Sequence, residues 1–415
     1  MPRLRQLCDD AAFPFAAFPA MQSVDQTRDW LLSQARPLQT SETVSLLDAA
    51  GRVLAADIVA ALDVPPHDNS AMDGYAVRAA DAANPLPVSQ RIPAGSQPQP
   101  LAAASAARIF TGAPIPADAD AVVMQEQAEV LDDGSVRFTA PVSAGQNIRR
   151  RGEDIASGQV VLAAGRRLGD ADIGLAASIG VAALPVLRSL RVAVFFTGDE
   201  LVEPGQPLAA GKIYNSNRYW LVPALRRLGC QVLDLGIVPD TLDATRAALR
   251  EAAASADVVM TCGGVSVGEE DHVKAAVEAE GALQLWKIAI KPGKPLASGR
   301  VGEADFIGLP GNPVSGFVTY AVLVRDFLRA RMGEAVQGWP QARQLPAAFE
   351  WNKPDAKREE FLRVQLREQD GQLVVSRYPN QGSGVLTSCA WADALVRLQP
   401  GQRVAPGDMV AVYPL

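Results

Sequence analysis

The chain has 415 residues, which is too long for one ordinary hydrophobic core and suggests roughly three domains. Its 48% hydrophobic and 20% charged residues are typical of a globular protein, and it has no run of about 18 apolar residues that could span a membrane. The formal net charge of −7 argues against broad nucleic-acid binding, although a small anionic ligand needs only a local cluster of donors.

The cysteine and histidine content limits the possible metal sites. The four cysteines lie far apart without a C-x-x-C pair, so neither a zinc site nor a disulfide framework is indicated. Two histidines are too few for a His-rich site, and any divalent ion is expected to have oxygen ligands. The first twenty residues lack the apolar core of a signal peptide. We therefore expect a cytoplasmic protein with neither a membrane nor a nucleic-acid partner.

The first half of the chain reads as one domain interrupted by another. Helices are expected at residues 23–35 and 170–179. Between them, residues 51–147 carry many prolines and short β-like runs, which is typical of a small β-rich domain. The sequence therefore predicts a discontinuous N-terminal domain, made of residues 21–50 and 148–188, with a β-rich domain inserted at 51–147.

From residue 190, strand-like and helix-like segments alternate. Residues 190–196 form a nearly all-apolar run, as a buried strand requires. The alternation predicts an α/β domain over residues 189–335, with a parallel sheet that binds ligands at the carboxyl ends of its strands. The expected helices span residues 217–228, 242–254 and 271–280, and the other expected strands span 231–238 and 257–261.

From about residue 338 the pattern becomes all-β. Residues 361–366 and 372–378 flank an Asp370-Gly371 turn, which is a hairpin signal, and 395–398 and 409–413 are further expected strands. We expect a small β-barrel-like domain over residues 336–415. The predicted fold class is therefore multidomain α/β plus β: a central α/β domain with a parallel sheet, a β-rich inserted domain and a C-terminal β-barrel-like domain.

Two loops of the α/β segment follow expected strands. In Thr-Gly-Asp-Glu-Leu (197–201) a glycine permits a sharp turn that would deliver Glu200 to the sheet edge, although a solvated turn is the alternative. Residues 262–271 contain three glycines, which let backbone N–H groups approach a phosphate at the start of a helix. No Gly-Lys-Ser/Thr follows, so this is not a Walker A loop.

Two further loops carry lysines and prolines. Residues 287–295 hold three lysines, and the prolines among them prevent a regular helix, so the lysines must project from extended chain or a turn. Such a cluster suits a polyanion or a tetrahedral oxyanion, with a surface charge run as the alternative. Gly-Leu-Pro-Gly-Asn-Pro-Val-Ser (308–315) precedes a long apolar helix expected at 318–331, and a purely structural helix cap is the alternative there.

An earlier loop, residues 68–77, reads Asp-Asn-Ser-Ala-Met-Asp-Gly-Tyr-Ala-Val and follows a Pro65-Pro66 break. It closely resembles the signature of the molybdopterin molybdenumtransferases, the family that includes MoeA and the C-terminal domain of gephyrin. The four loops above match that family's molybdopterin-binding domain in the same order. Residues 110–116, 148–155 and 381–384 resemble further family motifs. The resemblance therefore covers nearly the whole chain after residue 20.

The resemblance implies an enzyme that inserts molybdenum from molybdate into adenylylated molybdopterin and releases AMP, assisted by Mg²⁺. It implies that Glu200 and Asp271 bind the metal, because hard cations prefer carboxylates. Asp68 resembles the family's catalytic aspartate, and Thr111, Asp154 and Asp240 are secondary catalytic candidates. The residues implied in substrate binding are Gly263, Gly264, Ser266, Lys287, Lys291, Lys294, Pro310, Gly311, Asn312, Pro313 and Ser315.

The resemblance also implies an elongated N-terminal domain and a homodimer whose cleft is shared between subunits, so that Asp68 would act in trans. A molybdopterin adenylyltransferase and apo-molybdoenzymes are the protein partners it implies. Three positions depart from the family pattern: His67, Phe196 and Asp393 stand where Phe, Ser and Asn are common. Two alternatives remain open, namely a nucleotide pyrophosphatase on a related α/β domain and a non-catalytic gephyrin-like scaffold.

Overall fold

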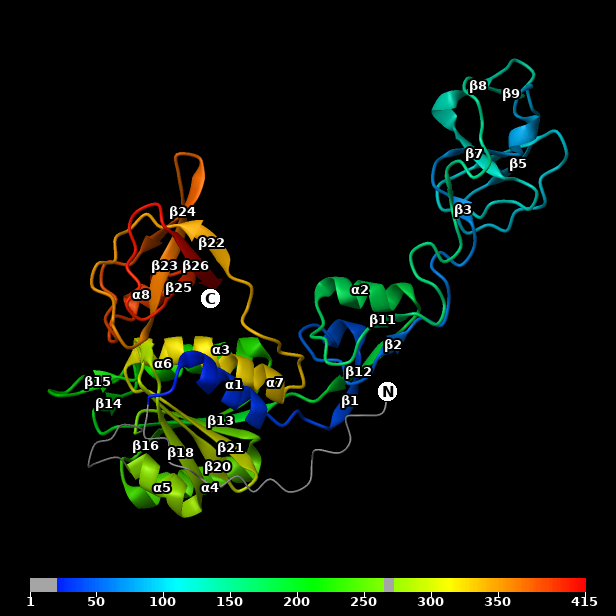
Figure 1. Ribbon diagram of the computed structural model, residues 1–415. Coiled ribbons are helices and arrows are strands. Elements are labelled where there is room, and N and C mark those ends of the chain that lie inside the picture. Colours follow the sequence, from blue (N-terminus) through cyan, green and yellow to red (C-terminus); the bar gives the residue numbers. More distant parts are fainter. Residues whose placement is uncertain (1–20, 265–271) are drawn as a thin grey trace. The chain divides into compact units, whose positions relative to one another are not determined.

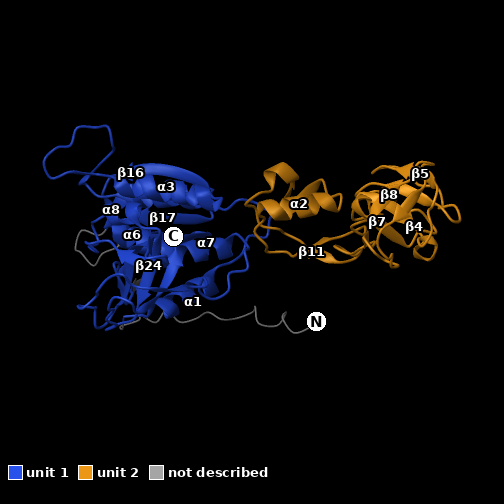
Figure 2. Ribbon diagram, turned by 90° about the horizontal axis from the view of Figure 1, so that it is seen from above, with its two compact units in different colours: residues 1–40, 187–415 blue, residues 41–186 orange. Residues whose placement is uncertain are grey.

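The computed structural model describes residues 21–264 and 272–415. The chain divides into two compact units, one made of the described residues up to 40 together with 187–415, and the other made of 41–186 (Figure 2). Within the described residues, no helix combines the length and apolarity that crossing a bilayer requires. Each unit is described below by itself.

The first unit is built on a six-stranded sheet with the strand order β16-β13-β17-β21-β20-β18 (Figure 1). Four strands are parallel, as expected, and β20 and β18 are joined at one edge by antiparallel pairings, so the sheet is mixed. Residues 192–196 of β13 are fully buried, because a parallel sheet is covered by helices on both faces. The strands are β13 (Arg191–Thr197), β16 (Gln231–Val238), β17 (Val258–Cys262), β18 (Gly281–Lys287), β20 (Pro295–Val301) and β21 (Ala304–Leu309).

Helices cover both faces of this sheet. Figure 1 shows α4 (Leu242–Ser255) and α5 (His272–Glu280) on one face, and α3 (Ser216–Leu228) with α1 (Val24–Gln34), α6 (Pro313–Thr319) and α7 (Arg325–Arg331) on the other. The N-terminal helix α1 (Val24–Gln34) begins with a capping box. The Gln26 N–H donates to the Ser23 hydroxyl, and the Ser23 N–H donates to the Gln26 side-chain oxygen, both at 3.1 Å. These bounds agree with the expected helices within two residues.

The helix expected at residues 318–331 begins earlier. It comprises α6 (Pro313–Thr319), a π-helical turn (Tyr320–Val324) and α7 (Arg325–Arg331). Asn312 is the N-cap and Pro313 occupies the first helical position, where a missing N–H and a fixed φ are tolerated. The apolar pattern therefore located the body of this helix, whereas the proline set its start.

A second sheet of the first unit has the order β19-β23-β25-β26-β22, with β24 paired to β23. Asp370 and Gly371 form the expected two-residue hairpin loop and both have positive φ, +52° and +74°. The sequence did not predict that β19, from the lysine-rich segment, would pair in parallel with β23. The elements are β19 (Ile290–Lys291), β22 (Arg343–Pro346), β23 (Glu359–Gln369), β24 (Gln372–Arg377), α8 (Thr387–Trp391), β25 (Ala394–Leu398) and β26 (Met409–Pro414). A short pair, β14 (Leu201–Val202) and β15 (Ile213–Tyr214), completes the unit.

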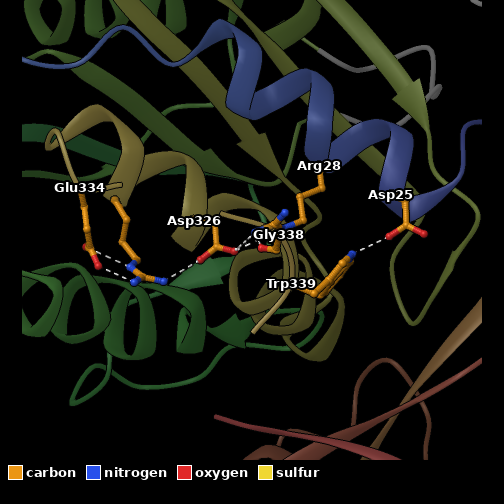
Figure 3. A network of polar contacts seen from close by, with 7 residues as sticks. Asp25, Arg28, Asp326, Glu334, Gly338 and Trp339 are labelled. Atoms are coloured by element: carbon orange, nitrogen blue, oxygen red, sulfur yellow. Dashed lines mark hydrogen bonds and ion pairs between the residues drawn. The ribbon is translucent and has the colours of Figure 1, made fainter. Parts of the chain in front are cut away.

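A polar network fixes α1 within the first unit (Figure 3). Arg28 donates to Asp326 of α7 at 2.7 Å and also to the carbonyl oxygen of Gly338. Its guanidinium lies 5.2 Å from the centre of the Trp339 ring, whose N–H donates to Asp25 at 2.6 Å. Asp326 accepts a second bond, at 3.1 Å, from Arg329. The first described helix is thus tied to residues far along the chain, 298 positions away in the case of the buried Arg28–Asp326 pair.

The second unit contains a four-stranded sheet, β5-β6-β4-β7, and several two-stranded pairs. The expected pairing of the N-terminal segment with residues 149–188 is present in the pair of β1 with β12, and β2, from the segment expected to belong to the inserted domain, also pairs with this stretch, through β11. The elements are β1 (Ser41–Ser45), β2 (Ile58–Val59), β3 (Asn69–Ser70), β4 (Gly74–Val77), β5 (Val88–Ile92), β6 (Ala106–Ile109), β7 (Ala121–Met124), β8 (Ala128–Val130), β9 (Val136–Phe138), β10 (Ile148–Arg149), β11 (Val160–Leu162), α2 (Asp170–Ser178) and β12 (Ala183–Leu187).

Asp257, just before β17, provides a pH-dependent contribution to the stability of the first unit. Burial alone would raise its pKa, but hydrogen bonds from the Arg188 guanidinium, both 2.7 Å, and the Arg191 N–H, 2.8 Å, lower the pKa to about 2 from 3.8. A carboxyl group whose pKa is lower in the folded than in the unfolded protein stabilises the fold at pH values above its unfolded-state pKa. This stabilisation is lost as the pH falls toward the folded-state pKa. We expect about 2 kcal/mol to be lost between about pH 5 and pH 2.

Urea unfolding of the wild type and of Asp257→Asn over this pH range measures that contribution. The stability gap between the two proteins should shrink by about 2 kcal/mol on acidification. A gap that does not change with pH would contradict the account.

Candidate active site

The first unit contains a cavity of about 680 Å³ at the carboxyl ends of β13, β17 and β21. The register of the sheet aligns these ends, since Cys262 pairs with Phe196 on one side and with Leu309 on the other. The loops that follow the three strands therefore open at one edge, which is where parallel sheets bind ligands. The lining residues are Thr197, Gly198, Glu200, Asp240, Gly263, Gly264, Lys291, Pro292, Gly293, Lys294, Pro295, Pro310, Gly311, Asn312, Ser315, Arg358, Gln381, Gly382 and Ser383.

Glycines bring the backbone close to this cavity. Gly263 and Gly264 have φ of +98° and +65°, values that favour glycine. A Cβ at Gly264 would lie 2.3 Å from Cγ2 of Val273 in α5, so no other residue fits there without displacing the helix. Gly263 and Gly264, directly after β17, thus present backbone rather than side chains to the cavity.

Two carboxylates enter the cavity from neighbouring loops. A Cβ at Gly198 would lie 2.6–2.9 Å from the carboxylate of Glu200, so this glycine lets Glu200 fold back against the turn. Asp240 follows β16, and its Oδ1 accepts a 3.0 Å hydrogen bond from the hydroxyl of Thr197. Both positions were predicted, whereas the orienting Thr197 was not.

The three lysines of residues 287–295 differ in whether they line the cavity. Lys291 and Lys294 line the cavity, whereas Lys287, at the end of β18, does not. The Lys291 ammonium lies 2.9 Å from Oε1 of Glu360, on the neighbouring strand β23. The expectation of extended chain or a turn is confirmed, because Lys291 belongs to β19 and Pro295 begins β20.

The Pro310–Asn312 loop is held from α3. The side-chain amide of Asn217 donates to the carbonyl oxygen of Gly311 at 2.7 Å, and Trp220 donates to Asn217 at 3.0 Å. Pro310, Gly311, Asn312 and Ser315 line the cavity, but Pro313 does not, because it opens α6. The loop therefore serves both as a cavity wall and as the entry to a helix.

The C-terminal sheet contributes cavity residues that the sequence did not predict. Arg358 lines the cavity from just before β23, and its guanidinium donates to Asp355 at 2.6 and 2.9 Å. Gln381, Gly382 and Ser383 line it too, although their motif had been noted without a site being assigned. No spacing signal marks Arg358, since it is adjacent to the cavity only through the β19–β23 pairing.

In the second unit, two motifs distant in sequence, residues 68–77 and 148–155, meet at Asp68. Its Oδ2 accepts from Arg150 at 2.6 Å and its Oδ1 from the Arg151 N–H at 2.8 Å. The Arg151 N–H is the main cause that lowers the pKa of Asp68, so this group is a carboxylate at neutral pH. Pairing of β3 with β10 (Ser70 with Ile148) explains the convergence.

The same unit orients Thr111 through an aspartate that was not singled out. Asp73 accepts from both the N–H and the hydroxyl of Thr111, each at 2.7 Å. Gly74 is required next to it, because a Cβ there would lie 1.9 Å from the carbonyl oxygen of Val123 in β7. Asp154 is exposed, and its N–H donates to the Val64 carbonyl oxygen at 3.0 Å.

Family models match three stretches of the chain: the MoeA N-terminal region (domain I and II) at residues 22–180, a probable molybdopterin binding domain at 193–330, and the MoeA C-terminal region (domain IV) at 344–415. The chain belongs to the MoeA family of molybdopterin molybdenumtransferases. A molybdopterin molybdenumtransferase from Haemophilus influenzae is 41% identical over 402 residues, covering 95% of this chain and 98% of the relative. One from Bacillus subtilis is 35% identical, with 88% and 87% coverage.

Solved MoeA structures have the same fold. A molybdopterin biosynthesis MoeA protein from Pyrococcus horikoshii superposes with a TM-score of 0.80 at 27% identity, covering 95% of this chain and all of the other. Within this MoeA chain, the cavity draws on the probable molybdopterin-binding region and on the C-terminal region, whereas Asp68, Thr111 and Asp154 lie in the N-terminal region. Ser266 and Asp271 fall outside the described residues.

The donor set of the cavity suits a hard cation. Glu200 and Asp240 supply carboxylate oxygens, which Mg²⁺ prefers, and Mg²⁺ usually takes only one or two carboxylates while keeping water and phosphate oxygens. Within the described part of the chain, no group of three or more His, Cys, Asp or Glu side chains is arranged to bind a metal.

Proposed function

We propose that this molybdopterin molybdenumtransferase binds adenylylated molybdopterin and molybdate in the 680 Å³ cavity of the first unit. One observation carries the proposal: a single cavity combines glycine-rich backbone, the cations Lys291, Lys294 and Arg358, and the carboxylate of Glu200. Backbone N–H groups and cations suit phosphate and molybdate oxygens, and a carboxylate suits the metal that accompanies them.

The substrate-binding roles follow from the chemistry of each wall. Gly263, Gly264 and Gly311 let the nucleotide phosphates approach the backbone, because glycines have no side chain to intervene. Lys291 and Lys294 supply positive charge for the tetrahedral oxyanion or for phosphate. Ser266, Pro313 and Ser315 complete the substrate-binding set that we propose from the family resemblance, whereas Lys287, which does not line the cavity, is left out of it.

Glu200 and Asp271 are the proposed Mg²⁺ ligands. Bound there, Mg²⁺ would neutralise phosphate charge as the phosphoanhydride bond breaks. Asp240, oriented by Thr197, is the nearby catalytic candidate. The chain's own part is to hold the carboxylates and the phosphates in fixed positions before the reaction.

Gly198→Ala tests the role of Glu200 without deleting the carboxylate. The added methyl group would occupy the space 2.6–2.9 Å from the Glu200 carboxylate and would displace it. We expect the Mg²⁺ concentration for half-maximal AMP release to rise roughly tenfold, because hard cations demand close ligand geometry. Gly205→Ala is the control, since its φ of +93° carries similar strain and nothing lies within 4 Å of the added Cβ. An equal Mg²⁺ requirement in both variants would count against Glu200 as a ligand.

We propose that the enzyme is a homodimer and that Asp68 acts on substrate bound by the partner subunit, with Thr111 and Asp154 as secondary catalytic residues. We also propose the four-domain division at residues 21–50 with 148–188, 51–147, 189–335 and 336–415, and a cytoplasmic location. A molybdopterin adenylyltransferase would supply the substrate, and apo-molybdoenzymes would receive the product. The support for these proposals is the family membership together with the carboxylate state of Asp68.

Lys291→Ala and Lys287→Ala form a matched pair that tests the cavity. Both remove one lysine from the same nine-residue segment, but only Lys291 lines the cavity. We expect Lys291→Ala to raise the KM for molybdate at least tenfold, because a charge-assisted contact to the oxyanion is lost. Lys287→Ala should change it less than about twofold. Equal effects would remove the cavity as the oxyanion site.

A further inference from the structure

Glu360, a buried glutamate outside the cavity, contacts one of the cations that line the cavity. The Glu360 side chain is only 2% exposed and does not line the cavity, yet its Oε1 lies 2.9 Å from the Lys291 ammonium. A buried carboxylate must be compensated by donors to be retained in a fold. Lys291 is therefore needed to compensate the buried charge of Glu360, independently of any bound substrate.

The other oxygen of Glu360 is also held. Oε2 accepts the Trp351 indole N–H at 2.8 Å and the Asp355 backbone N–H at 3.0 Å. The carboxylate is thus fixed from two directions before it meets Lys291, so it cannot rotate to follow the lysine. Instead, the flexible lysine side chain must come to the carboxylate.

Backbone pairing places the two residues opposite each other. Lys291 of β19 is paired in parallel with Glu360 of β23, and the Glu359 N–H donates to the Ala289 carbonyl oxygen at 2.8 Å. Lysine has a long side chain with high rotamer entropy, so a fixed partner removes most of its freedom before a ligand arrives. The 38% of the Lys291 side chain that stays exposed can still meet a ligand.

We propose that Glu360 is a positioning residue: its buried carboxylate fixes the Lys291 ammonium at the cavity wall and so pre-organises oxyanion binding. This inference rests on the proposed function of the cavity. Glu360 is also linked to Arg358 through Asp355. The Asp355 N–H donates to Glu360, and the Asp355 carboxylate accepts hydrogen bonds from the Arg358 guanidinium. The C-terminal sheet therefore positions two of the cations that enter the cavity.

Pre-organisation and simple charge balance predict opposite results for Glu360→Gln. Removing a negative charge near an anion site should lower the KM for molybdate if only charge matters. If Glu360 positions Lys291, the KM should rise roughly tenfold, less than the about hundredfold that a 1 Å misplacement can cost. The measurement is the KM for molybdate in AMP release by the full-length enzyme.

Glu359→Gln is the matched control. Glu359 is the preceding residue, is also buried, and is paired with Arg397 at 2.6 Å rather than with a cavity residue. Its substitution should leave the KM unchanged even if thermal stability falls. Equal KM shifts in Glu359→Gln and Glu360→Gln would overturn the proposal, because a general weakening of β23 would then explain both.

A double variant separates positioning from structural damage. If Glu360 acts through Lys291, Glu360→Gln should add nothing to the KM of Lys291→Ala, whereas independent effects would multiply and overturn the inference. If Glu360→Gln fails to fold, Trp351→Phe removes one donor to Oε2 and should raise the KM roughly twofold by the same route. An unchanged KM in Lys291→Ala itself would instead refute the proposed function of the cavity, and the inference with it.

Discussion

Replacing Asp68 by alanine is expected to reduce molybdenum insertion by about 10²–10³-fold while leaving nucleotide binding nearly unchanged. Asp68 is a carboxylate at neutral pH, held by Arg150 and by the Arg151 N–H at 2.6 and 2.8 Å. It belongs to the second unit, whereas the cavity proposed to bind the nucleotide belongs to the first. Loss of the carboxylate should therefore affect the reaction rather than affinity, and activity with KM for the nucleotide measures both.

Two further variants separate chemistry from local structure. Asp68→Asn keeps an oxygen that can accept the Arg151 N–H, so it should fold normally and still be inactive if the negative charge is needed. Asp63→Asn is the control, because Asp63 accepts from the Arg151 side chain at 2.6 Å and from the Ser157 N–H at 2.8 Å. Activity in Asp68→Asn equal to that of Asp63→Asn would show that Asp68 acts structurally.

Mixing Asp68→Ala and Lys291→Ala chains tests whether Asp68 acts in trans, when activity is assayed at molybdate concentrations well below the raised KM of Lys291→Ala. Dimers re-formed from Asp68→Ala and Lys291→Ala chains would be half mixed. Each mixed dimer would contain one cleft with both residues intact if Asp68 serves the partner's cavity. About a quarter of wild-type activity should then return. Activity restored to this level would also require the proposed dimer, whereas no restoration would contradict action in trans.

Arg28→Ala is expected to have the largest effect on stability, lowering the free energy of unfolding of the first unit by about 3 kcal/mol. The Arg28 and Asp326 side chains are 2% and 5% exposed, and Arg28 also contacts Gly338 and the Trp339 ring (Figure 3). Its removal leaves a buried carboxylate with one fewer donor and an unfilled space. Arg329 remains bonded to Asp326, which keeps the effect at the lower end for buried pairs.

Urea unfolding followed by tryptophan fluorescence measures this effect. Glu303→Ala is the control, because its carboxylate is fully exposed and only 3.6 Å from Arg300, so its loss should change stability by less than about 0.5 kcal/mol. A similar midpoint for both variants would contradict the role given to the network. The Arg28→Ala enzyme, where folded, should retain its KM for molybdate, since Arg28 does not line the cavity.

Much of the fold could be predicted because it depends on local patterns. The buried strands β13 and β17 are apolar runs, and the Asp370-Gly371 turn has the positive φ angles that its sequence favours. The family and the multidomain α/β plus β fold were both confirmed. The glycine and lysine loops were located by residue types that have few other uses at strand ends.

What escaped prediction depends on pairing between distant segments. The two-residue strand β19 has no periodicity of its own, so nothing in its sequence indicated that Lys291 would face Glu360. Arg358 reaches the cavity only through that pairing. Thr197 and Asp73 act by orienting another side chain, and such roles appear only when both partners are placed in space. The assigned roles of Asp68, Glu200 and the lysines stay predictions.

AMP release from adenylylated molybdopterin in the presence of Mg²⁺, with and without molybdate, tests the central claim most directly. The product would be scored by its ability to activate an apo-molybdoenzyme. We expect AMP release that depends on molybdate and yields active cofactor, because the cavity is proposed to hold both substrates. AMP release that ignores molybdate and yields no active cofactor would contradict this account and would favour a nucleotide pyrophosphatase acting at the same glycine-lined cavity.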